Sequence, residues 1–180
     1  MTGQLSKGLS RSPSLLGIYL NDHLAGATGG VELARRIAAE QRGTPAGGAV
    51  RELASDIAQD RAALVSIMKA LGIPVRQYKI GLGWAGEKVG RLKLNGYLAV
   101  RSPLSSLEEL ELMRLGAEGK AAGWRTLRAL ADSDSRVDAR QLDDLLGRAT
   151  AQVEILEDLR VKAASEIIGR EQATGQSGSV

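Results

Sequence analysis

Hydrophobic residues recur every three or four positions along most of the chain, which is the spacing of a helix face. The clearest stripe lies between residues 46 and 71 and consists of Val50, Leu53, Ile57, Leu64, Met68 and Leu71, interrupted at Asp60 or Arg61. Similar stripes predict long helices over residues 14–42, 102–131 and 138–168. A weaker stripe predicts a shorter helix over residues 75–94.

Turn signals separate these helices, and they indicate how the chain is connected. Gly43-Thr44-Pro45 and Gly72-Ile73-Pro74 each end a long helix. The connection from Leu71 to Leu104 is far longer than a helical hairpin needs. Its own helix of about 20 residues would cover about 30 Å at 1.5 Å per residue. The connection can therefore return the chain along the bundle and make the second and fourth helices parallel.

The predicted fold is all-α: a ferritin-like bundle of four long helices with an additional shorter crossover helix. An up-and-down five-helix bundle is the alternative. One domain is expected over residues 14–169, between flexible tails at 1–13 and 170–180 that are rich in Ser, Gly, Gln and Thr. Pairing the first two helices about Thr44 places Asp60 opposite Gly29 or Gly30, and His23 opposite Ser66 and Ile67.

Glycines interrupt two of the predicted helices, at residues 26–30 and at Gly116, Gly119 and Gly123. Each glycine costs about 1 kcal/mol relative to alanine inside a helix. Close approach of another helix would offset this cost, as would room for a large side chain such as Trp84 or Trp124. The glycine-rich helix faces therefore predict a homo-oligomer.

Composition narrows the function classes. The chain lacks cysteine, which excludes disulfides, thiolate metal sites and thiol nucleophiles. No apolar stretch reaches the roughly 18 residues of a membrane span, and the run at residues 15–20 is short for a signal peptide, so a cytoplasmic protein is expected. Gly81–Gly86 spells G-x-G-x-x-G, but it lies inside a helical stripe rather than after a strand, which argues against dinucleotide binding.

Positive charge concentrates in one segment, since residues 76–101 include six basic residues and a single acidic residue. Those on or beside the predicted short helix are Arg76, Lys79, Lys88, Arg91 and Lys93. A stripe of this kind is typical of a crossover helix packed on the bundle with its charges in water. A membrane-surface or nucleic-acid contact through this basic helix is the alternative.

A ferritin-type metal centre needs Glu-x-x-His on two helices, and this chain has one histidine, His23, with Leu20 three residues before it. We expect His23 to be a core histidine that is hydrogen-bonded to a neighbouring helix. An all-carboxylate site for iron or manganese is the alternative, with candidates His23, Glu52, Asp56, Asp60, Glu111, Glu118 and Glu154. Ion pairs of these acidic rows with Arg61, Arg114, Lys120 and Arg160, fixing the helix register, are the favoured interpretation.

Several stretches together resemble a group of bacterial proteins with ferritin-like helical bundles. They are Tyr19–Gly26, Gly90–Gly96, Ser102-Pro103-Leu104, and the segment from Glu109 through Lys120 to Trp124. The resemblance implies the fold and carries no activity. No familiar catalytic or cofactor motif is present in the sequence. The leading hypothesis is therefore a non-catalytic, binding or self-associating bundle, with a carboxylate-based metal or oxidase site as one alternative and the basic helix as another.

Overall fold

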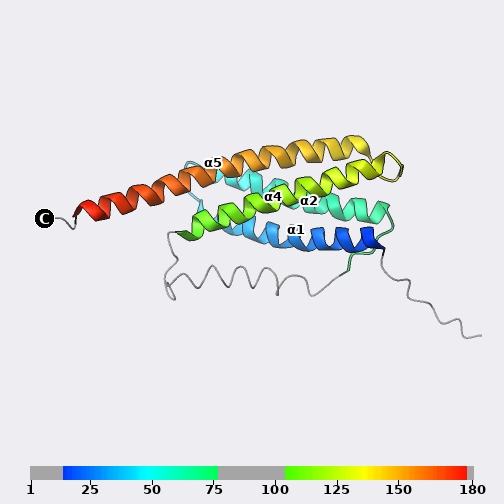
Figure 1. The fold of residues 1–180 in the computed structure, drawn as a ribbon, viewed down its shortest axis with the longest axis horizontal. Helices are drawn as coiled ribbons and strands as arrows, with labels where there is room; N and C mark the ends of the chain where they lie inside the picture. Colours follow the sequence, from blue (N-terminus) through cyan, green and yellow to red (C-terminus); the bar gives the residue numbers. More distant parts are fainter. Residues whose placement is uncertain (1–13, 77–103, 178–180) are drawn as a thin grey trace, which may run out of the picture.

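The computed structural model describes residues 14–76 and 104–177, and this part of the chain is helical, without strands. The helices are α1 (Leu15–Glu40), α2 (Gly47–Ala70), α4 (Leu104–Ala131) and α5 (Ala139–Ser177) (Figure 1). The predicted bounds are confirmed to within two residues, with one exception. α5 continues to Ser177 instead of ending at Ile168 and enters the predicted tail, because residues 169–177 hold no proline to break it. The predicted shorter helix lies outside the described residues except at its start.

The helices form a bundle in which α1 packs against both α2 and α4, and α4 packs against α5. Arg136, in the loop after α4, donates from Nη1 to the carbonyl oxygen of Leu71, over 3.2 Å. The end of α2 and the end of α4 therefore lie at the same end of the bundle, and α2 and α4 run parallel (Figure 1). This direction agrees with the one predicted from the long connection.

Polar contacts between side chains show which residues lie opposite each other in two antiparallel helix pairs, α1 with α2 and α4 with α5. Arg61 on α2 donates from Nε to Thr28 Oγ1 on α1, over 2.9 Å, which confirms the pairing predicted about Thr44. Between α4 and α5, Glu111 pairs with Arg160 at 3.9 Å and Arg114 pairs with Glu157 at 3.0 Å. Moving three residues forward on α4 moves the partner three residues back on α5, so the two helices run antiparallel in one register.

The core consists of two apolar clusters, one toward each end of the bundle. The first contains Leu20, Leu24, Leu64, Met68, Trp124, Leu127, Leu142 and Ala149, and the second contains Val31, Ile37, Val50, Ile57, Met113, Ala117 and Leu156. The stripe predicted for α2 is buried at every position. For α1, the spacing of the sequence places Leu16, Tyr19, Leu20, His23, Ala27, Ala34 and Ile37 on the apolar face. This face is partly wrong, because Leu24 and Val31 are buried in the core while Tyr19 and His23 are only half-buried.

Candidate functional site

A layer of polar side chains separates the two apolar clusters. On α2, Asp60 lies between Ile57 of one cluster and Leu64 of the other. Lys120 occupies the same level on α4, and Arg148 and Gln152 occupy it on α5. We call these four residues the polar layer. Asp60 is its centre and is the most deeply buried charged side chain in the described part of the chain, at 1% exposure.

Both oxygens of the Asp60 carboxylate have basic or amide neighbours. Lys120 Nζ donates to Oδ2 over 2.5 Å, and Gln152 Nε2 donates to the same oxygen over 3.0 Å. Arg148 Nη2 lies 2.7 Å from Oδ1, as an ion pair without the angle of a good hydrogen bond. Lys120 Nζ also donates to Gln152 Oε1. The single carboxylate thus joins three helices, α2, α4 and α5.

The electrostatics of the layer depend on burial and on the unequal number of charges. Burial lowers the pKa of the Lys120 ammonium, and the nearby Asp60 carboxylate opposes that shift. Arg148 lowers the pKa of Lys120 further, because it is a second cation beside the first. The side chains of Lys120 and Arg148 are 16% and 32% exposed. The layer thus places two basic side chains around one acidic side chain.

The structure does not gather the acidic residues that the sequence offered as metal ligands. Asp60 is buried and Asp56 is half-buried, while the remaining acidic candidates are exposed: Glu52, Glu111, Glu118 and Glu154. Within residues 14–76 and 104–177, no three side chains of His, Asp or Glu lie together as metal ligands. An iron or manganese site therefore stays a prediction, and the described residues do not bring a set of ligands together for it.

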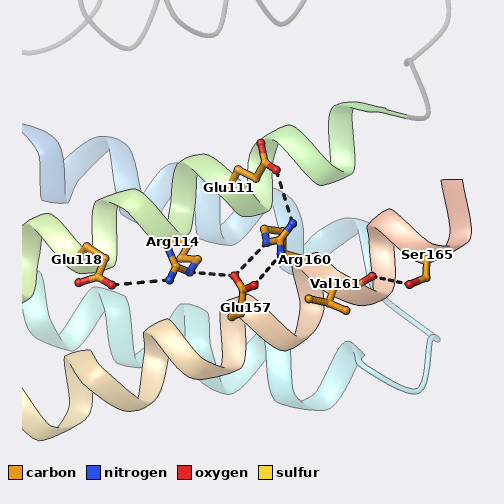
Figure 2. A network of polar contacts seen from close by, with 7 residues as sticks. All are labelled: Glu111, Arg114, Glu118, Glu157, Arg160, Val161 and Ser165. Atoms are coloured by element: carbon orange, nitrogen blue, oxygen red, sulfur yellow. Dashed lines mark hydrogen bonds and ion pairs between the residues drawn. The ribbon is translucent and has the colours of Figure 1, made fainter. Parts of the chain in front are cut away.

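Several of these acidic residues form ion pairs with arginine or lysine instead. Figure 2 shows a chain of contacts on α4 and α5, in which Arg114 reaches Glu118 and Glu157, and Arg160 reaches Glu157 and Glu111. The hydrogen bond from Arg160 lowers the pKa of Glu157 below its usual value. Three of the four predicted basic partners are found in such pairs, since Lys120 binds Asp60. The fourth, Arg61, donates to Thr28.

His23 lies on the side of α1 that faces α4, not opposite α2 as the pairing about Thr44 suggested. A Cβ atom on Gly123 would come within 3.1 Å of the imidazole ring, so glycine leaves the space that the ring fills. Tyr19 meets the ring edge-on at a centroid distance of 4.5 Å. Burial lowers the pKa of His23, and the carboxylate of Asp22 opposes the shift. The predicted hydrogen bond to a neighbouring helix is not formed with any described residue.

Four other glycines of α1 and α4 form an open surface. Tyr19 Oη and Thr126 Oγ1 lie 3.2 Å apart, and equal steps along the two antiparallel helices bring Gly26 level with Gly119. Gly30 and Gly116 follow at the next turn. A Cβ atom on any of these four glycines would meet no heavy atom within 4 Å. We call Gly26, Gly30, Gly116 and Gly119 the glycine seam. Of the predicted close contacts in α4, only that of Gly123 lies between described helices.

The basic surface can be placed at one residue. Arg76 is half-buried, and its backbone N–H donates to Asn21 Oδ1 over 2.8 Å. Lys79, Lys88, Arg91 and Lys93 lie outside the described residues. No helix in the described ranges combines the length and apolar composition that a membrane span requires.

Comparison with known proteins gave no match: no family model matches the chain, and no similar curated protein or solved structure was found. The site is therefore interpreted from its own geometry. Sequence reasoning missed Arg148 and Gln152. Gln152 stands three residues after Ala149 and four before Leu156, so a polar residue inside an apolar stripe was the signal that could have identified it.

Proposed function

We propose that the protein is a non-catalytic cytoplasmic bundle of ferritin-like shape that acts by binding, and that it associates with itself. The observation that carries this proposal is that Lys120, Arg148 and Gln152 surround the Asp60 carboxylate. A buried carboxylate held between two cations stabilises the relative positions of three helices. The protein's own side chains, Lys120 and Gln152 at Oδ2 and Arg148 at Oδ1, thus occupy the positions beside the carboxylate that a substrate or metal ion would need. Binding then falls to the surface of the bundle.

The ferritin-like part of the proposal is supported by the helix directions. Parallel α2 and α4 require residues 71–104 to carry the chain back over the length of the bundle. A single long crossover of this kind distinguishes ferritin-like bundles from up-and-down bundles with short hairpins. The resemblance of residues 19–26 and 109–124 to bacterial proteins of this shape points to the same topology.

The glycine seam is the surface that we propose for self-association. Glycine lets the backbones of two helices approach closely, and the seam combines glycines from two neighbouring helices at matching levels. Leu115 beside it is 64% exposed, and Ala122 is also exposed, so the surrounding surface includes apolar positions. Burial of this surface against a second molecule would be favourable at about 25 cal/mol per Å² of apolar area.

Size-exclusion chromatography with light scattering, over a wide range of protein concentration, tests self-association. We expect a dimer or larger species whose population falls in the variant Gly119→Lys. The matched control is Gly147→Lys, because Gly147 is an exposed helical glycine of α5 that likewise has no neighbour within 4 Å of a Cβ atom. A strict monomer at high concentration, or equal effects of both substitutions, would remove self-association through the seam.

A further inference from the structure

We propose that residues 157–177 of α5 form a strap that opens from the bundle as one unit, and that the ion pairs to α4 in Figure 2 hold it closed. The rest of the bundle stays folded when the strap opens. This property goes beyond the proposed function, because it holds whether or not the protein associates with itself through the glycine seam.

The burial of α5 is uneven along its length. Its first part carries a regular series of side chains that are each at most 3% exposed: Leu142, Leu145, Ala149, Gln152 and Leu156. From residue 157 to residue 169, no residue is buried. Leu159 and Ala163 pack there against the second apolar cluster, and both are only half-buried. Because apolar burial drives the packing of helices, α5 is anchored firmly up to Leu156 and weakly after it.

The strap also extends past the helix on which it packs. Glu111 on α4 lies opposite Arg160 on α5, so the step back to Leu104, where α4 begins, corresponds to an equal step forward to Ile167. Residues 168–177 therefore lie beyond the start of α4, as Figure 1 shows. Ile168 is 54% exposed. Packing on α4 thus reaches only the first half of the strap.

Charged side chains link this first half of the strap to α4. Arg114 Nε on α4 lies 3.0 Å from Glu157 Oε2, and Glu111 Oε1 on α4 lies 3.9 Å from Arg160 Nη1. Arg160 also donates to Glu157 within the strap, which joins the two contacts into one network (Figure 2). The four side chains are between 29% and 49% exposed, so salt in solution screens their attraction. The closed position of the strap therefore depends on contacts that ionic strength weakens.

Release of the strap would unwind it and uncover apolar surface. In proteins, most of the stability of a helix comes from the packing of one face, and the strap loses that packing when it leaves α4. Its backbone amides would then exchange their hydrogens with the solvent. Release also uncovers the side of the second apolar cluster on which Leu159 and Ala163 pack. The strap thus controls access to an apolar surface of the bundle.

Hydrogen–deuterium exchange with peptide mass spectrometry tests the strap in the full chain. The test variant carries Glu111→Gln and Arg114→Gln, which remove both ion pairs from the α4 side. It leaves the sequence of α5 unchanged, and it keeps the net charge because one acidic and one basic residue are lost. The matched control carries Arg128→Gln and Asp132→Asn, which remove the ion pair of Arg128 with Asp143 on the firmly anchored part of α5. Circular dichroism would establish that both variants are folded.

In the native chain at low salt, we expect the amides of residues 157–169 to exchange faster than those of residues 142–156 and to share one degree of protection, as a cooperative unit does. Sodium chloride at about 1 M should lower the protection of the strap severalfold, because the Debye length falls to about 3 Å. The protection of residues 142–156 should change little. The test variant should show the lower protection of the strap already at low salt and respond little to added salt. The control variant should behave in the strap like the native chain.

Equal protection of residues 157–169 and 142–156 would overturn the proposal, since the strap would then open only when the whole protein unfolds. Protection that falls steadily toward the C-terminus, and that is the same in the native chain and the test variant, would also overturn it. That result is ordinary fraying of a helix end, without a unit held by ion pairs. Equal loss of protection in the test and control variants, or a strap that does not respond to salt, would have the same meaning.

Discussion

Lys120 Nζ lies 2.5 Å from Asp60 Oδ2, and this contact joins two parallel helices that both pack against α1. The bond sits at the level where the apolar core divides into its two clusters. An apolar contact at this level would tolerate sliding of one helix against the next. A charged contact that is correct at only one level does not, so the pair specifies the register of α2 relative to α4.

Replacement of Asp60 with alanine should destabilise the protein strongly. The substitution leaves the Lys120 ammonium and the Arg148 guanidinium facing each other without their anion. Removing one partner of a buried ion pair typically costs 3–5 kcal/mol, and the partial exposure of both cations favours the lower value, about 3 kcal/mol. Equilibrium denaturation by urea, with circular dichroism as the signal, measures this loss.

The matched control is Glu52→Ala, on the same helix and exposed. It should change the free energy of unfolding by about 0.5 kcal/mol or less, as surface substitutions usually do. A comparable loss in both variants would show that α2 responds to any change of charge. In that case the polar layer would not have the stabilising role that its geometry indicates.

The sequence predicted the helices and most of the core because both depend on local periodicity. The stripe of α2 and its interruption at Asp60 could be identified residue by residue. Even the pairing of α1 with α2 followed from the short turn at Thr44, since an antiparallel hairpin fixes which residues face each other. Contacts that depend on a short turn or on an apolar stripe could thus be predicted from the sequence.

The side chains that contact Asp60 could be predicted from the sequence only in part. Lys120 and Arg148 lie on α4 and α5, and their approach to α2 depends on how three helices pack together. No spacing along the chain encodes that arrangement. The same limit explains His23, whose contact with Gly123 follows from the rotation of α1 about its axis toward α4. A rotation of that size moves a residue from one neighbouring helix to the next without changing the apolar pattern.

Metal content should be low and independent of Asp60. We expect the untagged protein to retain far less than stoichiometric iron or manganese, both as isolated and after aerobic incubation with ferrous iron. The physical reason is that Asp60 already binds two cations of the protein itself. Elemental analysis measures the ratio, with Asp60→Ala as the comparison. Stoichiometric metal that disappears in the variant would restore the carboxylate-based oxidase hypothesis and locate its site.

Gly123→Ala should destabilise the protein, since the new methyl group would lie 3.1 Å from the His23 ring. Overpacking of this kind costs roughly 1–3 kcal/mol. The control Gly147→Ala, at an open helical position, should instead stabilise the protein by about 0.5–1 kcal/mol through helix propensity. Thermal or urea denaturation compares the two. A stabilising effect of Gly123→Ala would mean that α1 and α4 are not in close contact at His23.

Titration of His23 should make the free energy of unfolding depend on pH near neutrality. Burial lowers its pKa in the folded state below the usual value of 6.5, so the unfolded chain takes up a proton first as the pH falls. The contribution of His23 to stability is therefore complete above pH 6.5 and is lost below it, as the pH falls through the folded-state pKa. Urea denaturation at intervals between pH 8 and pH 5 measures this loss, and NMR titration of the single imidazole locates the folded-state pKa.

The comparison variant is His23→Gln, which keeps a polar side chain of similar size but does not titrate in this range. Its stability should change less than that of the native chain between pH 6.5 and pH 5, because the carboxylates titrate mostly at lower pH in both proteins. If the two proteins lost stability in parallel over this range, the imidazole would have the same pKa folded and unfolded. The contact with Gly123 and Tyr19 would then leave the ring as hydrated as it is in the unfolded chain, contrary to its half-buried position between α1 and α4.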